Sequence, residues 1–189
     1  MPDPDWWQAL WPDPAGVLEA CGIRPGMDVV DLCCGDGWFT QPLSFIARSL
    51  VAIDINVELL DIAKRRLAEQ AGPASLRFVA ADAYDIGRIV SAPVDHVFLA
   101  NAFHGVPDQP RLVGAIRDVL KPAGLLAIVS WHARPREKTV VLGKPRGPAM
   151  ELRMEPSQTS VAVEEGGFER LLTVDVSPYH YAMVFTRAD

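Results

Sequence analysis

The chain has 189 residues, of which 49% are hydrophobic and 22% are charged, and its formal net charge is −6 at pH 7. This composition is typical of a globular protein and too apolar for a disordered one. The negative charge argues against a nucleic-acid backbone as the main partner, and no apolar run approaches the roughly 20 residues needed to cross a bilayer. We therefore expect one domain over residues 1–189 with neither nucleic acid nor membrane as partner. The oligomeric state stays open.

The start of the chain and its cysteines indicate where the protein resides. The first residues, Met1 to Asp5, are acidic and proline-rich, unlike the basic start of a signal peptide, so we expect a cytoplasmic protein. The three cysteines are an odd number and show no cysteine–histidine spacing of a zinc site. Free thiols and no metal site are predicted.

Strand-like and helix-like patterns alternate from residue 27 to residue 131. Short apolar runs predict strands over residues 27–33, 50–55, 76–80, 94–99 and 125–131. Apolar residues at helical spacing predict helices from Phe39, after an Asn56 cap and after an Asp108 cap. Lys121-Pro122-Ala123-Gly124 is expected to end the last of these helices, with the glycine supplying the turn. The pattern predicts an α/β fold with a mostly parallel, Rossmann-like sheet of seven strands and helices on both faces.

The last two strands of this sheet come from the end of the chain. A short helix is predicted over residues 156–165, followed by strands over residues 168–176 and 179–187. Ser177-Pro178 joins these two strands, and so short a connection makes the last strand run antiparallel to its neighbour.

Two segments lie outside the alternating pattern. Residues 1–22 are predicted to form a helical cap carrying Trp6, Trp7 and Trp11; packing on the domain is the favoured role, and contact with a cationic or apolar substrate is the alternative. Residues 133–155 have no steady period, which predicts a long loop and possible lid. Between residues 134 and 146 this loop carries five basic side chains, opposed only by Glu137, which face either solvent or an anionic substrate. They are Arg134, Arg136, Lys138, Lys144 and Arg146.

A glycine-bearing turn follows the first predicted strand, in Val29-Val30-Asp31-Leu32-Cys33-Cys34-Gly35-Asp36-Gly37. Gly35 and Gly37 let the backbone bend tightly and approach a ligand. Backbone amides at the start of the next helix favour a carboxylate or phosphate. Such turns also serve dinucleotides, or simply close a loop.

Two acidic residues narrow the choice of ligand. Asp54 ends the second strand, where a carboxylate can accept hydrogen bonds from both ribose hydroxyls of a nucleoside. Asp82 follows the third strand and can accept from an adenine amino group. Either carboxylate alone could be a helix cap or a surface group, but open α/β sheets bind ligands at the carboxyl ends of successive strands. The pair therefore predicts a nucleoside site.

The motifs taken in order resemble class I S-adenosylmethionine-dependent methyltransferases. The resemblance rests on the glycine turn, on Ala-Ile-Asp54, on Ala-Asp82-Ala, on Phe98 to His104 and on Leu120 to Ser130. It spans about residues 12–187, includes the final antiparallel strand, and is nearest to the small-molecule branch that includes quinone-biosynthesis enzymes. S-adenosylmethionine is then the expected cofactor and a small molecule the expected acceptor.

The resemblance also assigns roles to individual residues. It places Asp31 and the glycine turn at the methionine part of the cofactor, Asp54 at the ribose, Asp82 with Ala83 at the adenine edge, and Asn101 near the sulfonium. With Cys33, Gly35, Gly37 and Ile55 these residues are the predicted cofactor-binding set. Two positions depart from the family pattern, since Cys33 and Ala123 stand where the family usually has glycine.

Methyl transfer mainly requires alignment of donor and acceptor and exclusion of water. A base is needed only where the acceptor must lose a proton, and His104 and His132 follow the fourth and fifth strands at the expected active edge. Either histidine could instead be structural. No paired carboxylates follow the fourth strand, so a magnesium-assisted mechanism is unsupported.

Two other functions compete with a methyltransferase. A nicotinamide-dependent oxidoreductase would want a third glycine near Thr40 and a separate substrate domain. A non-catalytic module that binds S-adenosylmethionine would keep the same fold and the same cofactor residues.

Overall fold

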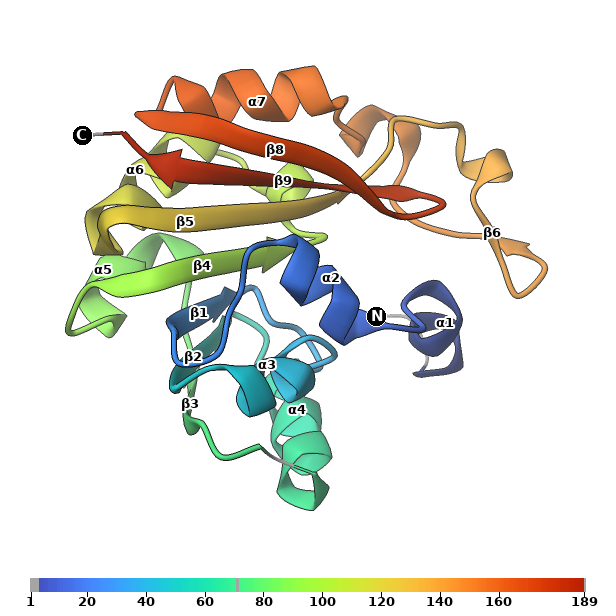
Figure 1. Ribbon diagram of the computed structural model, residues 1–189. Helices are drawn as coiled ribbons and strands as arrows, with labels where there is room; N and C mark the ends of the chain where they lie inside the picture. Colours follow the sequence, from blue (N-terminus) through green and yellow to red (C-terminus); the bar gives the residue numbers. More distant parts are fainter. Residues whose placement is uncertain (1–3, 71, 189) are drawn as a thin grey trace.

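One seven-stranded sheet organises the computed structural model, which describes residues 4–70 and 72–188 (Figure 1). The order across the sheet is β3-β2-β1-β4-β5-β9-β8, and β9 runs antiparallel to both β5 and β8. The predicted seven-stranded sheet with an antiparallel last strand is confirmed. The strands are β1 (Asp28–Leu32), β2 (Ser49–Asp54), β3 (Ser75–Ala80), β4 (Val94–Ala100), β5 (Leu120–Trp131), β8 (Phe168–Ser177) and β9 (His180–Arg187).

The strand order reverses at β1, which pairs in parallel with β2 on one side and with β4 on the other. Chain connections leave these strands in opposite directions, so a crevice opens at their carboxyl ends. This crevice lies where the glycine turn and the acidic residues are predicted to converge.

Helices cover both faces of the sheet. One apolar cluster includes Leu18 and Leu43, and a second, on the other face, includes Ile116 and Val163. The two predicted caps are confirmed: the side chain of Asn56 accepts a hydrogen bond from the Glu58 amide at 2.9 Å, and Asp108 caps its helix in the same way. The helices that follow β1 in the chain are α3 (Thr40–Ile46), α4 (Val57–Glu69), α5 (Ile86–Ile89), α6 (Gln109–Val119) and α7 (Pro156–Glu164).

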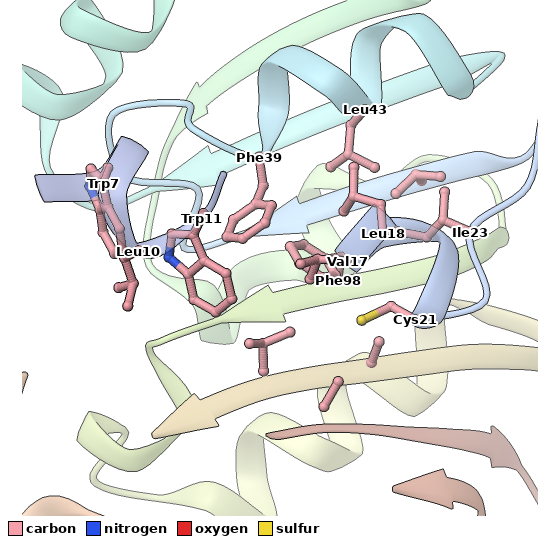
Figure 2. Packing of buried hydrophobic residues seen from close by; sticks show 14 of the residues in the cluster. Trp7, Leu10, Trp11, Val17, Leu18, Cys21, Ile23, Phe39, Leu43 and Phe98 are labelled. Carbon is pink, nitrogen blue, oxygen red and sulfur yellow. The ribbon is translucent and has the colours of Figure 1, made fainter. Parts of the chain in front are cut away.

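The N-terminal segment forms two short helices, α1 (Pro4–Leu10) and α2 (Pro14–Ala20). Trp11, which lies between them, is 1% exposed and packs edge-on against Phe39 with 5.3 Å between ring centroids (Figure 2). Phe39 in turn packs against Phe98 of β4. This aromatic contact holds the N-terminal helices against the carboxyl ends of the strands.

The segment 133–155 is more ordered than a long loop. It contains two 3-10 turns (Arg136–Lys138 and Met150–Leu152) and a hairpin of two short strands, β6 (Val140–Val141) and β7 (Lys144–Pro145). Strand β6 contacts α1, beyond the carboxyl ends of β4 and β5 (Figure 1).

The turn before the fifth predicted strand differs from expectation. Ala123, not Gly124, has the positive φ, 57°. Gly124 is needed because an added Cβ would lie 2.8 Å from the Lys121 carbonyl oxygen. The strand itself begins at Leu120 and is interrupted by a register shift before Leu125. Within the described ranges, no helix combines the length and apolarity that crossing a membrane requires.

Candidate functional site

Two adjoining pockets lie at the carboxyl ends of the parallel strands. The larger has a volume of about 610 Å³ and the smaller about 320 Å³, and Cys33, Asp54 and Ala102 line both. The larger pocket extends from the glycine turn toward α1 and the segment 133–155. The smaller one lies between the ends of β2 and β3.

Asp54 is fixed between the glycine turn and the start of α4. One carboxylate oxygen accepts a hydrogen bond from the Gly35 amide and the other from the Asn56 amide, both at 2.8 Å. The residue is 9% exposed, yet it lines both pockets. Because a carboxylate oxygen can accept more than one hydrogen bond, both oxygens retain capacity for a ligand diol.

Cys33 stands at the junction of the two pockets with a φ of 59°, a conformation that favours glycine. Burial, with the nearby carboxylates of Asp54, Asp31 and Asp82, raises the pKa of the thiol to about 12. Cys33 is therefore a neutral side chain that narrows the passage between the pockets.

The two glycines of the turn have different roles. Gly35 lines the larger pocket, as expected. Gly37 lines neither pocket; its φ is 80°, and an added Cβ would lie 2.8 Å from the Cβ of Ala63 on α4. Gly37 therefore meets a packing requirement between the turn and α4, and its contact with the cofactor stays a prediction.

Asp31, the second-last residue of β1, lines the larger pocket. Its carboxylate accepts a 2.6 Å hydrogen bond from the Thr40 hydroxyl. Burial and, to a lesser extent, the charge of Asp54 raise its pKa from 3.8 to about 7, against the opposing effect of the Thr40 hydrogen bond. A cationic ligand group beside Asp31 would favour the ionised form.

The smaller pocket contains the residues predicted at the adenine edge. Ile55, Asp82 and Ala83 all line it, beside Tyr84. The Asp82 side chain also accepts a hydrogen bond from the Tyr84 amide at 3.0 Å, so it caps the 3-10 turn Ala83–Asp85. The cap and the pocket position are compatible, because one carboxylate serves both.

Asn101 and His104 lie together on the wall of the larger pocket. Neither amide atom of Asn101, nor Nδ1 of His104, has a hydrogen-bond partner among the described residues, although all three atoms are buried. Burial, with a smaller contribution from Arg153, lowers the pKa of His104 below its usual 6.5. At neutral pH His104 is an uncharged group that can accept a proton.

His132 follows β5 at the carboxyl edge of the sheet, as predicted, but its side chain does not join that of His104 in the larger pocket. It lines neither pocket, and its Nε2 lies 2.9 Å from Oδ1 of Asp175. Side chains alternate along a strand, so Trp131 faces the larger pocket while the next residue turns to the opposite side. Trp131 is the residue that sequence reasoning missed there.

An aromatic wall closes the outer end of the larger pocket. Trp6 and Trp131 stack with 6.3 Å between ring centroids, and Trp7 packs against Trp6 at 5.1 Å. Trp38 also lines this pocket, and its position is fixed by Arg66, whose guanidinium carbon lies 5.0 Å from the ring centroid. Among the described residues, no group of three or more potential metal ligands is brought together.

Comparison with known proteins gives related sequences. A model of the methyltransferase domain matches residues 29–124. The 2-phytyl-1,4-naphtoquinone methyltransferase of Trichormus variabilis is 29% identical over 132 residues, which are 68% of this chain and 56% of that protein. The demethylmenaquinone methyltransferase of Leptospira interrogans is 31% identical over 101 residues, or 52% of this chain and 41% of the relative. The chain thus spans about half the length of these curated relatives.

Comparison of folds agrees with the sequence matches. The crystal structure of a SAM dependent methyltransferase from Aquifex aeolicus superposes with a TM-score of 0.80 at 22% identity, covering 97% of this chain and 93% of that one. The family match covers the glycine turn, Asp54, Asp82 and Asn101, all of which line the two pockets. The chain therefore belongs to the methyltransferase-domain family, within the class I S-adenosylmethionine-dependent methyltransferases.

Proposed function

We propose that the protein transfers a methyl group from S-adenosylmethionine to a small planar acceptor of the quinol (reduced quinone) type. The observation that carries this proposal is the position of Asp54, whose carboxylate borders both pockets and is oriented by the Gly35 amide. The donor set fits the cofactor: Asp54 for the ribose diol, the smaller pocket with Asp82 and Ala83 for the adenine, and the turn with Asp31 for the methionine part.

The remaining residues of the larger pocket suit the acceptor. When bound, S-adenosylmethionine supplies an electrophilic methyl carbon on a sulfonium sulfur. The indoles of Trp6 and Trp131 exclude water and align a flat ring. Neutral His104 would accept the proton that a hydroxyl or ring carbon of the acceptor releases when it bonds to the methyl carbon and the bond from that carbon to the sulfonium sulfur breaks, leaving S-adenosylhomocysteine. The names of the two relatives refer to a naphtoquinone and to demethylmenaquinone, and these motivate the choice of a bicyclic ring.

Cofactor titration and turnover test this function. Calorimetry is expected to detect binding of S-adenosylhomocysteine and none of NADH. Incubation with methyl-labelled S-adenosylmethionine and reduced naphthoquinones is expected to release S-adenosylhomocysteine and label the acceptor. Binding of NADH in its place would favour the oxidoreductase. Binding of S-adenosylhomocysteine without turnover on any reduced quinone would favour the non-catalytic module.

A further inference from the structure

The outer end of the larger pocket has a cationic edge. Arg136 and Arg146, both from the segment 133–155, line the pocket together with Trp6. The guanidinium carbon of Arg146 lies 5.4 Å from the ring centroid of Trp6. None of the ion pairs found in the described residues includes either arginine. Two positive charges therefore face the pocket without a carboxylate of the described residues to neutralise them.

Arg146 is held in place by buried groups. Its amide donates to the Thr139 carbonyl oxygen at 2.8 Å, and its own carbonyl oxygen accepts from the Thr139 hydroxyl at 2.7 Å and from the Arg153 guanidinium at 2.9 Å. Thr139 is fully buried and Arg153 is 5% exposed. The Nε of Arg146 is also buried and has no acceptor among the described residues. A buried donor without an acceptor costs free energy, so we expect an acceptor group on a ligand to pair with this Nε.

The cationic edge lies away from the proposed adenosine end. The smaller pocket is joined to the larger one through Cys33, Asp54 and Ala102, and neither arginine lines it. The three carboxylates that line the larger pocket already have partners: Asp54 accepts from two backbone amides, Asp36 pairs with Arg66 at 3.0 Å, and Asp31 accepts from the Thr40 hydroxyl. None of them forms an ion pair with Arg136 or Arg146.

The side chains at the cationic edge indicate the kind of ligand that it can bind. Trp6 and Trp131 are 6% and 3% exposed and line the cavity, where they can contact an aromatic ring. Guanidinium groups form charge-assisted hydrogen bonds with carboxylates. A cavity of about 610 Å³ is large enough for the methionine part of the cofactor together with a bicyclic ring. We propose that the quinol-type acceptor carries a carboxylate, with its planar ring beside Trp6 and Trp131 and its carboxylate on Arg146 and Arg136. This deepens the proposed function, on which it rests.

Binding of a matched pair of probes tests the charge requirement. The probes are 2-naphthoate and 2-naphthamide, which share a ring and a shape but differ in charge, titrated by calorimetry into the protein saturated with S-adenosylhomocysteine. The wild-type protein is expected to bind the carboxylate at least about tenfold more tightly than the amide, as two charge-assisted hydrogen bonds require. Arg146→Gln and Arg136→Gln are each expected to reduce this preference. Lys144→Gln, an exposed cation of the same hairpin outside the pocket lining, is expected to leave it unchanged.

Each other outcome has a defined meaning. Equal affinity for the two probes, or an equal loss in Lys144→Gln, overturns the proposal. A loss of S-adenosylhomocysteine affinity in Arg146→Gln also overturns the proposal. It would mean that this arginine binds the methionine carboxylate of the cofactor and not the carboxylate of the acceptor. Failure of the wild-type protein to bind S-adenosylhomocysteine at all contradicts the proposed function, whereas a missing probe preference in a protein that binds it contradicts only the acceptor class. Thermal unfolding of each variant excludes misfolding as the cause.

Discussion

The guanidinium carbon of Arg153 lies 5.1 Å from the ring centroid of Trp131, so a buried cation links the segment 133–155 to the end of β5. The same guanidinium donates hydrogen bonds to the backbone carbonyl oxygens of Pro148, Arg134 and Arg146 and to the Thr139 hydroxyl. A single side chain thus organises a segment with little regular secondary structure, and it does so against Trp131, which lines the larger pocket.

Replacing Arg153 by lysine is expected to destabilise the protein. An ammonium group cannot reproduce the planar fork that serves four acceptors, so buried oxygens lose their donors. We expect the free energy of unfolding to fall by about 2–4 kcal/mol, measured by urea denaturation. Arg88→Lys is the control, since Arg88 is exposed and paired only with Asp85; it should change stability by less than about 0.5 kcal/mol. Equal stability of the two variants would show that the fork is dispensable.

Replacing Asp54 by alanine is expected to weaken cofactor binding. The change removes a charged hydrogen-bond acceptor for the ribose, and the affinity for S-adenosylhomocysteine should fall by about 2 kcal/mol, or about 30-fold. Calorimetry measures the change. Asp61→Ala, an exposed carboxylate of α4 paired with Lys64, should bind as the wild-type protein does. Unchanged affinity in Asp54→Ala would mean that the ribose site is misplaced.

The raised pKa of Asp31 predicts a pH dependence of stability. From about pH 4 to about pH 7 the native protein holds a proton on Asp31 that the unfolded chain has released. The unfolded state therefore binds fewer protons, and this contribution to stability decreases as pH rises through that range. Asp31→Asn stays neutral, so its free energy of unfolding should rise relative to that of the wild-type protein as pH increases. A constant difference in urea denaturation at all pH values would contradict the raised pKa.

The positive φ of Cys33 predicts how two substitutions differ. Glycine relieves a left-handed conformation that costs a side chain about 1–2 kcal/mol, but it also makes the unfolded chain more flexible. Cys33→Gly should therefore unfold within about 1 kcal/mol of the wild-type protein and bind S-adenosylhomocysteine at least as tightly. Cys33→Val, with a β-branched side chain in the same conformation, should be less stable than either. Valine and glycine variants of equal stability would exclude backbone strain at this turn.

His104 is expected to affect turnover more than binding. His104→Gln removes the proposed proton acceptor and should lower kcat at least about 100-fold, while the affinity for S-adenosylhomocysteine stays the same. In the wild-type protein the acidic limb of the rate profile should lie below pH 6.5, since the histidine pKa is lowered. His132→Gln is the matched control, because this histidine contacts Asp175 and lines neither pocket. Equal rates in the two variants would make His104 a structural residue.

Local patterns predicted the fold well. The buried strands are short apolar runs, and Asn56 and Asp108 are caps whose effect depends only on adjacent amides. A prediction was wrong where a local pattern has two structural solutions. In Lys121-Pro122-Ala123-Gly124 the positive φ falls on Ala123 and not on Gly124. Gly37, predicted in a ligand-binding turn, is also required for packing against α4.

The candidate site was less predictable, because its outer wall depends on contacts between distant residues. Asp54 and Asp82 could be placed from the ends of two strands. Trp131 could have been found from alternation along β5, which turns His132 away from the pocket. The stacking of Trp131 on Trp6 and the position of Arg146 depend on how the segment 133–155 folds around Arg153. No residue spacing in the sequence predicts these contacts.

The hydrogen bond from the Gly35 amide to Asp54 connects the turn after β1 with the end of β2, two elements that follow one another in the chain. The wall formed by Trp6, Trp131 and Arg146 is instead assembled from three separate regions of the chain. Under the proposed function, affinity for the nucleoside and choice of acceptor are expected to be separable. Exchange of residues in α1, or of Arg146, is expected to alter the choice of acceptor without changing the backbone donors that Gly35 and Asn56 supply to the Asp54 carboxylate.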